Sequence, residues 1–123
     1  MPLKRESFRY ILIKILLPKE NFELKRESFQ SALTNSILTL FGEVGLTESK
    51  FKLLTFNQEK KFAIVKCSKN FLNNFRAATA LINEIDNKPI LLFIAKASGT
   101  IKGVKKALFF NKKENNQNQE NNQ

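Results

Sequence analysis

The sequence contains no histidine, and this absence excludes several kinds of active site. Histidine is the general base of Ser-His-Asp and Cys-His sites and the commonest metal ligand of proteins. The single cysteine, Cys67, leaves no intrachain disulfide and no zinc site built from several thiolates. A chain without disulfides fits a reducing, intracellular compartment. Because Cys67 lies on the apolar face of a predicted strand, with Ala63 and Val65, we expect it to be a buried small side chain rather than a nucleophile.

Acidic residues are scarce, with 11 Asp and Glu against 21 Lys and Arg in 123 residues and a net charge of +10. Between Lys88 and Lys113 there are seven lysines and no acid. Such a positive field favours nucleic acid or an anionic membrane surface as the partner. The alternative is that the charge serves solubility alone. The carboxylates form no close group in the sequence, so nothing indicates a metal site.

Long hydrophobic runs are also absent. Lys14 interrupts the apolar run 11–17, and the uncharged run 90–95 is far shorter than the roughly 20 residues that span a bilayer. No small-residue cleavage site follows the N-terminal run, so we expect neither export nor a membrane partner. Residues 111–123 contain only Asn, Gln, Lys and Glu. We therefore predict one domain over residues 1–110 and a disordered tail over residues 111–123.

The apolar residues that are present, 42% of the chain, follow strand and helix periods in turn. Gly42 predicts that the helix over residues 27–41 ends there, with the glycine in the left-handed backbone conformation. The order β-α-β-β-α-β predicts an α+β fold of the ferredoxin-like or RRM-like kind, a four-stranded antiparallel sheet with two helices on one face and a further C-terminal helix. The predicted strands are 9–17, 50–56, 62–67 and 90–97, and the predicted helices are 27–41, 70–86 and 101–110.

The sheet face away from the two helices is expected to be free for solvent, a partner or RNA. Alternation along the strands places Tyr10, Lys14, Phe62, Ile64 and Lys66 on that face. An RNA recognition motif stacks bases on several aromatic rings of its central strands. The corresponding segment here offers Phe62 alone, so specific stacking of single-stranded bases is not expected.

A small turn, Ser98-Gly99-Thr100, precedes the predicted C-terminal helix. Backbone N–H groups at such a turn and helix start favour a phosphate. Lys102, Lys105 and Lys106 follow at spacings that share one helix face. The alternative is an ordinary turn, capped by Ser98 or Thr100, with a solvated row of lysines. No Walker-type glycine-lysine pattern is present, so nucleotide hydrolysis is not supported.

Several short stretches form one pattern along the chain. They are Arg9-Tyr10-Ile11-Leu12, Leu40-Phe41-Gly42-Glu43-Val44-Gly45, Ala63-Ile64-Val65-Lys66-Cys67-Ser68, Arg76-Ala77-Ala78-Thr79-Ala80-Leu81-Ile82, Lys88-Pro89 and Ser98-Gly99-Thr100-Ile101-Lys102. The Arg-Tyr start and the Ser-Gly-Thr-Ile-Lys motif, in this order and spacing, are the most specific features of the pattern. With these stretches the chain resembles, over about residues 8–110, the family of archaeal ribonuclease P protein component 2 and its counterpart in eukaryotic ribonuclease P and ribonuclease MRP.

The resemblance implies a non-catalytic subunit of an RNA enzyme that removes 5′ leaders from precursor tRNA. It implies Mg²⁺ for the catalytic RNA and no cofactor bound by the protein itself. The implied partners are ribonuclease P RNA, precursor tRNA, a TIM-barrel-like protein subunit, and a second copy of this chain within a heterotetramer. The implied location is the cytoplasm for an archaeal-type protein, and the nucleus or nucleolus for a eukaryotic one.

Charge and placement, rather than the resemblance, select the candidate site residues. The side chains expected to contact a protein are Tyr10, Leu12, Phe62 and Ile64. No catalytic or metal-binding residue is expected. Two other functions stay open, a small ferredoxin-like domain that binds an anionic metabolite and an RNA-binding module that acts alone. The residues expected to contact RNA are Lys4, Arg5, Arg9, Lys14, Lys66, Ser98, Gly99, Thr100, Lys102, Lys105 and Lys106.

Overall fold

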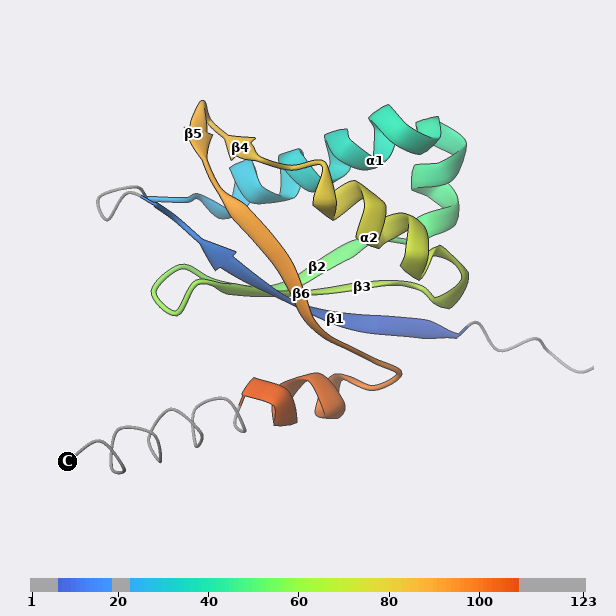
Figure 1. The fold of residues 1–123 in the computed structure, drawn as a ribbon. Helices are drawn as coiled ribbons and strands as arrows, with labels where there is room; N and C mark the ends of the chain where they lie inside the picture. The colour runs from blue at the N-terminus through green and yellow to red at the C-terminus, as the bar shows by residue number, and fades with distance from the viewer. Residues whose placement is uncertain (1–6, 19–22, 109–123) are drawn as a thin grey trace, which may run out of the picture.

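The structure, a computed structural model, describes residues 7–18 and 23–108, and it contains a four-stranded antiparallel sheet (Figure 1). The strand order is β2-β3-β1-β6, so β1 and β3 are central. Two helices, α1 and α2, cover one face of the sheet (Figure 1). The predicted α+β fold is confirmed. The strands of this sheet are β1 (Phe8–Leu16), β2 (Lys52–Asn57), β3 (Phe62–Ser68) and β6 (Leu91–Ser98), and the two helices are α1 (Arg26–Ser49) and α2 (Leu72–Ala80).

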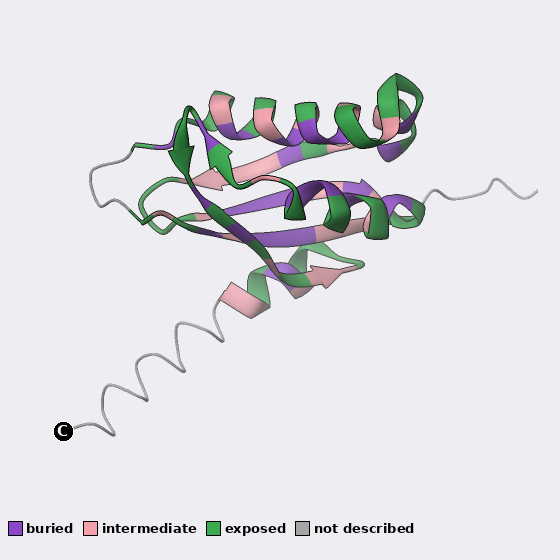
Figure 2. Cartoon of the chain, turned by 45° about the horizontal axis from the view of Figure 1, so that its top comes forward, coloured by how far each residue is buried: buried purple, intermediate pink, exposed green. Residues whose placement is uncertain are grey.

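The main core lies between the sheet and the two helices. Alternate residues of the central strands point into it, because successive strand side chains face opposite sides of a sheet. Figure 2 shows the buried residues concentrated in the strands and on the inner sides of the helices. A fully buried large apolar side chain contributes about 1.5–3 kcal/mol. Fully buried members of this core are Ile11, Ile13, Ala63, Val65, Phe29, Leu33, Ile37, Phe75 and Ala78.

The first helix continues past its predicted end. Gly42 has φ 71°, so the left-handed conformation predicted there is confirmed, but it kinks α1 rather than ending it. Helical residues continue beyond the kink to Ser49 and include Gly45. Gly45 is buried, and an added Cβ there would collide with the Phe41 side chain. A second short helical stretch therefore packs closely after the kink.

The second helix ends earlier than predicted. A single 3-10 turn, η1 (Lys69–Phe71), leads into α2, and two short paired strands, β4 (Glu84–Ile85) and β5 (Lys88–Pro89), follow it. Asp86 and Asn87 have φ of 55° and 64°. A two-residue hairpin turn with positive φ at both positions favours Asp and Asn. This turn chemistry overrides the helical spacing, so the predicted helix over 81–86 is wrong.

Residues 101–108 form a third helix, which lies on the opposite side of the sheet from α1 and α2 (Figure 1). Its fully buried Val104 packs on Leu12 and Ile64, which are 0% and 1% exposed. The sheet face that was expected to be free is therefore partly covered by the chain itself. The predicted tail, residues 111–123, lies outside the described residues, as do Lys4 and Arg5. None of the helices in the described ranges is long and apolar enough to cross a bilayer.

Candidate nucleic-acid interface

Charge is distributed unevenly between the two sides of the sheet. The strands β1, β2, β3 and β6 contain no Asp or Glu, and neither does the helix over residues 101–108. The acidic residues of the described ranges lie in α1, in loops and in β4. They are Glu23, Glu27, Glu43, Glu48, Glu59, Glu84 and Asp86.

The strand register places four lysines on the sheet face that carries the helix 101–108. We call this face the lysine face. Opposite residues of paired antiparallel strands point to the same side of a sheet. Lys66 is paired with Tyr10 and Lys52, and Lys96 is paired with Leu12. Lys14 lies between Phe62 and Phe93 on the neighbouring strands. Lysines from β1, β3, β6 and the edge strand β2, which lie far apart in the sequence, therefore share one positive surface.

The helix over residues 101–108 adds three lysines to this face. Lys102, Lys105 and Lys106 are exposed, whereas Val104 points at the sheet. These three lysines lie on one exposed side of the helix, as predicted. Together with the four strand lysines they make a surface with seven positive charges and, among these elements, no acidic residue.

The turn before this helix is held by its own side chains. The Thr100 N–H donates to Ser98 Oγ at 3.3 Å, and the Gly103 N–H donates to Thr100 Oγ1 at 3.1 Å. The second bond is the usual arrangement of a helix N-cap, and it satisfies one of the unpaired N–H groups of the first turn. The predicted cap at Thr100 is confirmed. A phosphate contact by Ser98, Gly99 or Thr100 stays a prediction.

Arg9 lies beside this turn. Its Nη1 donates to the Phe8 carbonyl oxygen at 2.9 Å, and an added Cβ on Gly99 would lie 3.5 Å from the same nitrogen. The structure therefore brings together one basic residue of the N-terminal segment and the turn near the C-terminal lysines. Lys66 is held in another way, with its Nζ 4.0 Å from the centre of the Phe8 ring. A cation above an aromatic face is stabilised while it stays near the surface.

The candidate protein contacts on this face need correction. Leu12 and Ile64 were expected to be accessible, but both are buried beneath Val104. Tyr10 and Phe62 are half-buried and pack against the same small cluster. Their contact with a protein partner stays a prediction. The helical spacing of Val104, Ala107 and Leu108 is the sequence signal for this cover, whereas alternation along the strands by itself predicts an open face.

Cys67 is fully buried, as predicted. Removal from water raises the pKa of its thiol to about 11, because burial disfavours the charged thiolate. A thiol in this state is a poor nucleophile at neutral pH. The described residues include no group of three or more Cys, Asp and Glu that could hold a metal ion. The exposed lysines of the lysine face are suited to binding negative charge.

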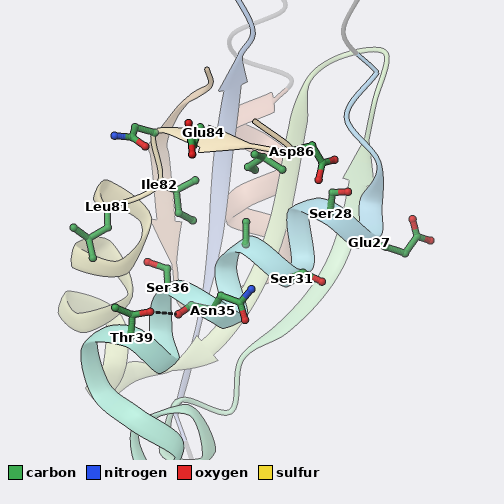
Figure 3. Close-up of a pocket in the computed structure, with 13 residues that line it drawn as sticks. Glu27, Ser28, Ser31, Asn35, Ser36, Thr39, Leu81, Ile82, Glu84 and Asp86 are labelled. Carbon is green, nitrogen blue, oxygen red and sulfur yellow. Dashed lines mark hydrogen bonds between the residues drawn. The ribbon is translucent and has the colours of Figure 1, made fainter. Parts of the chain in front are cut away.

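A groove of about 640 Å³ on the other side of the molecule has the opposite character. It lies between α1 and the segment after α2 (Figure 3). Ser28, Ser31 and Asn35 line it from α1, and its charged lining residues are acidic. A negatively charged ligand is disfavoured here, which leaves the lysine face as the candidate nucleic-acid interface. The acidic lining residues are Glu27, Glu84 and Asp86.

Comparison with known proteins gives consistent matches over almost all of the described chain. The sequence profile of the Rpp14/Pop5 family matches residues 9–109. Ribonuclease P protein component 2 of Pyrococcus furiosus is 27% identical over 105 residues, which are 85% of this chain and 85% of that protein. The ribonuclease P/MRP protein subunit POP5 of Schizosaccharomyces pombe is 30% identical over 111 residues, with 80% of each covered.

A solved structure shares the fold at low sequence identity. A chain in the cryo-EM structure of yeast ribonuclease MRP superposes with a TM-score of 0.64 and 13% identity, and the match covers 97% of each chain. At this identity the likeness supports the fold alone.

Proposed function

The chain belongs to the Rpp14/Pop5 family, and from this premise we propose how it works as a protein subunit of ribonuclease P. We propose that it performs no chemistry itself and that its lysine face binds ribonuclease P RNA. The RNA then removes the 5′ leader of precursor tRNA. The observation that carries this proposal is the acid-free surface of seven lysines formed by the sheet and the helix 101–108.

Charge neutralisation is the proposed mechanism. A folded catalytic RNA crowds its phosphates together, and lysines on a fixed surface reduce their repulsion without occupying the Mg²⁺ sites of the RNA. Each phosphate contact releases counterions, which makes binding depend on salt. Lys102, Lys105 and Lys106 extend away from Val104 into solvent, so they can reach phosphates without disturbing the small core beneath them.

The proposed metal belongs to the RNA. The described residues include no group of three or more Cys, Asp and Glu that could hold a metal ion. The half-buried Tyr10 and Phe62 are proposed to touch a protein neighbour at the border of the lysine face. Further proposed partners are a TIM-barrel-like protein subunit, a second copy of this chain within a heterotetramer, and precursor tRNA. The proposed location is the cytoplasm in an archaeon and the nucleus or nucleolus in a eukaryote.

An RNA-binding module that stacks single-stranded bases is less well supported. Such a module needs accessible aromatic rings on its central strands. Here Ile64 is buried under the third helix, and the neighbouring Phe62 is partly covered by the same helix. The lysines around them favour phosphate contact instead.

Reconstitution of precursor tRNA cleavage tests the proposal. The cognate RNA and its other protein subunits are assembled with and without the full chain, and cleavage is measured over a Mg²⁺ series. We expect the chain to lower the Mg²⁺ concentration needed for half-maximal cleavage, and the chain alone to cleave nothing. Cleavage that is unchanged by omitting the chain, or cleavage by the isolated chain, would contradict the proposal.

A matched pair of variants assigns the effect to the lysine face. One replaces Lys102, Lys105 and Lys106 with Glu. The other replaces with Glu the exposed residues Lys25, Lys60 and Lys69, which lie outside the strands and the helix that form this face. Each variant lowers the net charge from +10 to +4, so their net charges are equal. We expect the first variant alone to lose the shift in Mg²⁺ requirement. Equal losses would show that only the net charge matters.

A further inference from the structure

Strand β6 forms one edge of the sheet. The order β2-β3-β1-β6 pairs its inner side with β1, and no strand in the described ranges pairs with its outer side. It is eight residues long. An unpaired edge presents a row of N–H and C=O groups that can bond to another extended chain.

The two halves of β6 differ in how they are protected. The register with β1 shifts between Leu12 and Ile13, which leaves Ala95 without a partner, and exposed Lys96 follows it. Bulges and lysines are the features by which sheet edges commonly avoid pairing. The half over Leu91–Ile94 has neither. It instead exposes two large apolar side chains on the side of the strand that faces away from α2, where Phe93 is paired with Lys14. Leu91 is 57% and Phe93 40% accessible.

A groove of about 240 Å³ runs along this unprotected half. Its walls come from α2 and β6, and Leu81, at the end of α2, adds a further exposed apolar side chain. Alternate side chains of a strand added to the edge would enter such a groove, while its backbone pairs with β6. The residues that line the groove are Arg76, Thr79, Ala80, Leu92, Phe93 and Ile94.

Charge decides which occupant fits. Arg76 is the only charged residue that lines the groove, it is exposed, and its guanidinium makes no hydrogen bond or ion pair with the rest of the described chain. Lys96 stands at the other end of the strand. A second copy of the chain would bring the same cations, and its net charge of +10, against them. A segment that carries carboxylates would be attracted.

We propose that the edge of β6 over Leu91–Ile94 accepts an extended, acidic segment of a different protein as a fifth strand. Apolar side chains at alternate positions of that segment enter the groove beside α2, and a carboxylate meets Arg76. This inference goes beyond the RNA-binding role, because it concerns a backbone edge that the lysines do not use. It holds whether or not the lysine face binds RNA.

Photo-crosslinking in the assembled complex tests the proposal. A photoreactive phenylalanine derivative replaces Phe93 in the tagged full chain, and a control chain carries it at Val44, an apolar residue of α1 that is 70% exposed. After irradiation of the purified complex, mass spectrometry identifies the joined peptide. We expect position 93, but not position 44, to join one segment of a different protein with acidic residues and alternating apolar side chains.

Hydrogen exchange reports whether that segment pairs with the backbone. The outward-facing amides within residues 91–94 should exchange at least about tenfold more slowly in the complex than in the free chain, since strand pairing protects edge amides. Failure of position 93 to join any segment of a different protein, or joining to an isotopically labelled second copy of the chain, would overturn the proposal. So would unchanged exchange at residues 91–94. A crosslink to RNA in addition would not, because Phe93 lies beside Lys14 on the lysine face. The RNA recovered with the complex is measured separately, so failure of this inference is distinguishable from failure of the proposed function.

Two test substitutions and one control substitution examine the same edge. Phe93→Lys places a charge at the edge, and Val44→Lys is the matched control with the same change in charge. We expect Phe93→Lys to lower recovery of the crosslinked partner about tenfold or more, which corresponds to roughly 1.4 kcal/mol. Arg76→Glu should weaken the same association, because its carboxylate would face the acidic segment. Stronger association of the Arg76→Glu variant would contradict the assigned sign of the partner's charge.

Discussion

Gly103 allows the third helix to start in close contact with the turn that precedes it. The helix starts so close to the preceding turn that a Cβ at position 103 would collide with the Ser98 side chain. Gly99, only four residues earlier, is different, since a Cβ there would meet Arg9 Nη1 at 3.5 Å, an ordinary contact. The requirement for glycine is therefore specific to position 103.

We expect Gly103→Ala to destabilise the chain by about 1 kcal/mol, because Ser98 Oγ must rotate away from the added Cβ and loses the hydrogen bond from the Thr100 N–H. Urea unfolding followed by circular dichroism measures the change. Gly99→Ala is the control and should stay within about 0.5 kcal/mol, as for most exposed substitutions. Equal effects of the two substitutions would show that the contact with Ser98 does not matter.

Cys67 provides a pH dependence with a definite sign. Burial raises the pKa of its thiol from 9.0 to about 11, so between these values the unfolded chain loses this proton while the folded chain keeps it. The contribution is fully present below pH 9 and is lost as the pH rises toward 11. We expect the free energy of unfolding to fall over this interval more steeply in the wild type than in Cys67→Ala. Parallel curves for the two proteins would refute this expectation.

At the scale of elements, the helix over residues 101–108 replaces solvent on the second sheet face with a small core of its own. Val104 is fully buried against Leu12 and Ile64, and Ala107 and Leu108 pack beside them. The outer side of the same helix carries three lysines. One amphipathic element thus covers apolar strand residues and also presents positive charge, which explains why the face is basic without exposing Leu12 or Ile64.

Val104→Ala should therefore lower the free energy of unfolding by roughly 1–2 kcal/mol, since it removes two buried methyl-sized groups at about 0.8 kcal/mol each. Chemical denaturation provides the measurement. Ile101→Ala removes a larger part of a side chain that is 37% exposed, and it should cost less. A larger loss for Ile101→Ala would mean that Val104 is not the anchor of the helix.

At the scale of the whole molecule, the sheet separates charges of opposite sign. Lysines gather on the face with the third helix, whereas the groove between α1 and the segment after α2 is lined by acidic residues (Figure 3). A net charge of +10 alone would attract any polyanion. The separation gives the molecule one side on which an RNA can dock.

This arrangement predicts the salt dependence of RNA binding. Each phosphate contact contributes about 0.7–0.9 to the slope of log K against log salt. Replacing Lys102, Lys105 and Lys106 with Gln should reduce the slope by about 2–3. Filter binding of the cognate RNA over a salt series measures it. Gln at positions 25, 60 and 69 serves as the control and should leave the slope nearly unchanged, whereas equal reductions would argue against a localised site.

Much of the fold was predictable because it depends on short-range patterns. Period-two and helical apolar spacing located all four strands of the main sheet and the positions of three helices, and Thr100 was identified as a possible cap from its place before the helix. The left-handed conformation at Gly42 was also predictable, because glycine favours it. The errors lay at boundaries. Asp86 and Asn87 form a turn within a span whose apolar spacing looked helical, and helical residues continue beyond Gly42.

The sequence by itself determined the absence of histidine chemistry, the surplus of positive charge and the periodicity of the elements, since these depend on residue types and their near neighbours. Only the tertiary structure decided which side of the sheet the third helix covers, that Leu12 and Ile64 are buried, and that Arg9 lies beside Gly99. It also decided that lysines from distant strands share one face, and that the outer edge of β6 opens beside α2. These features depend on contacts and strand register between segments far apart in the chain, which local patterns do not fix.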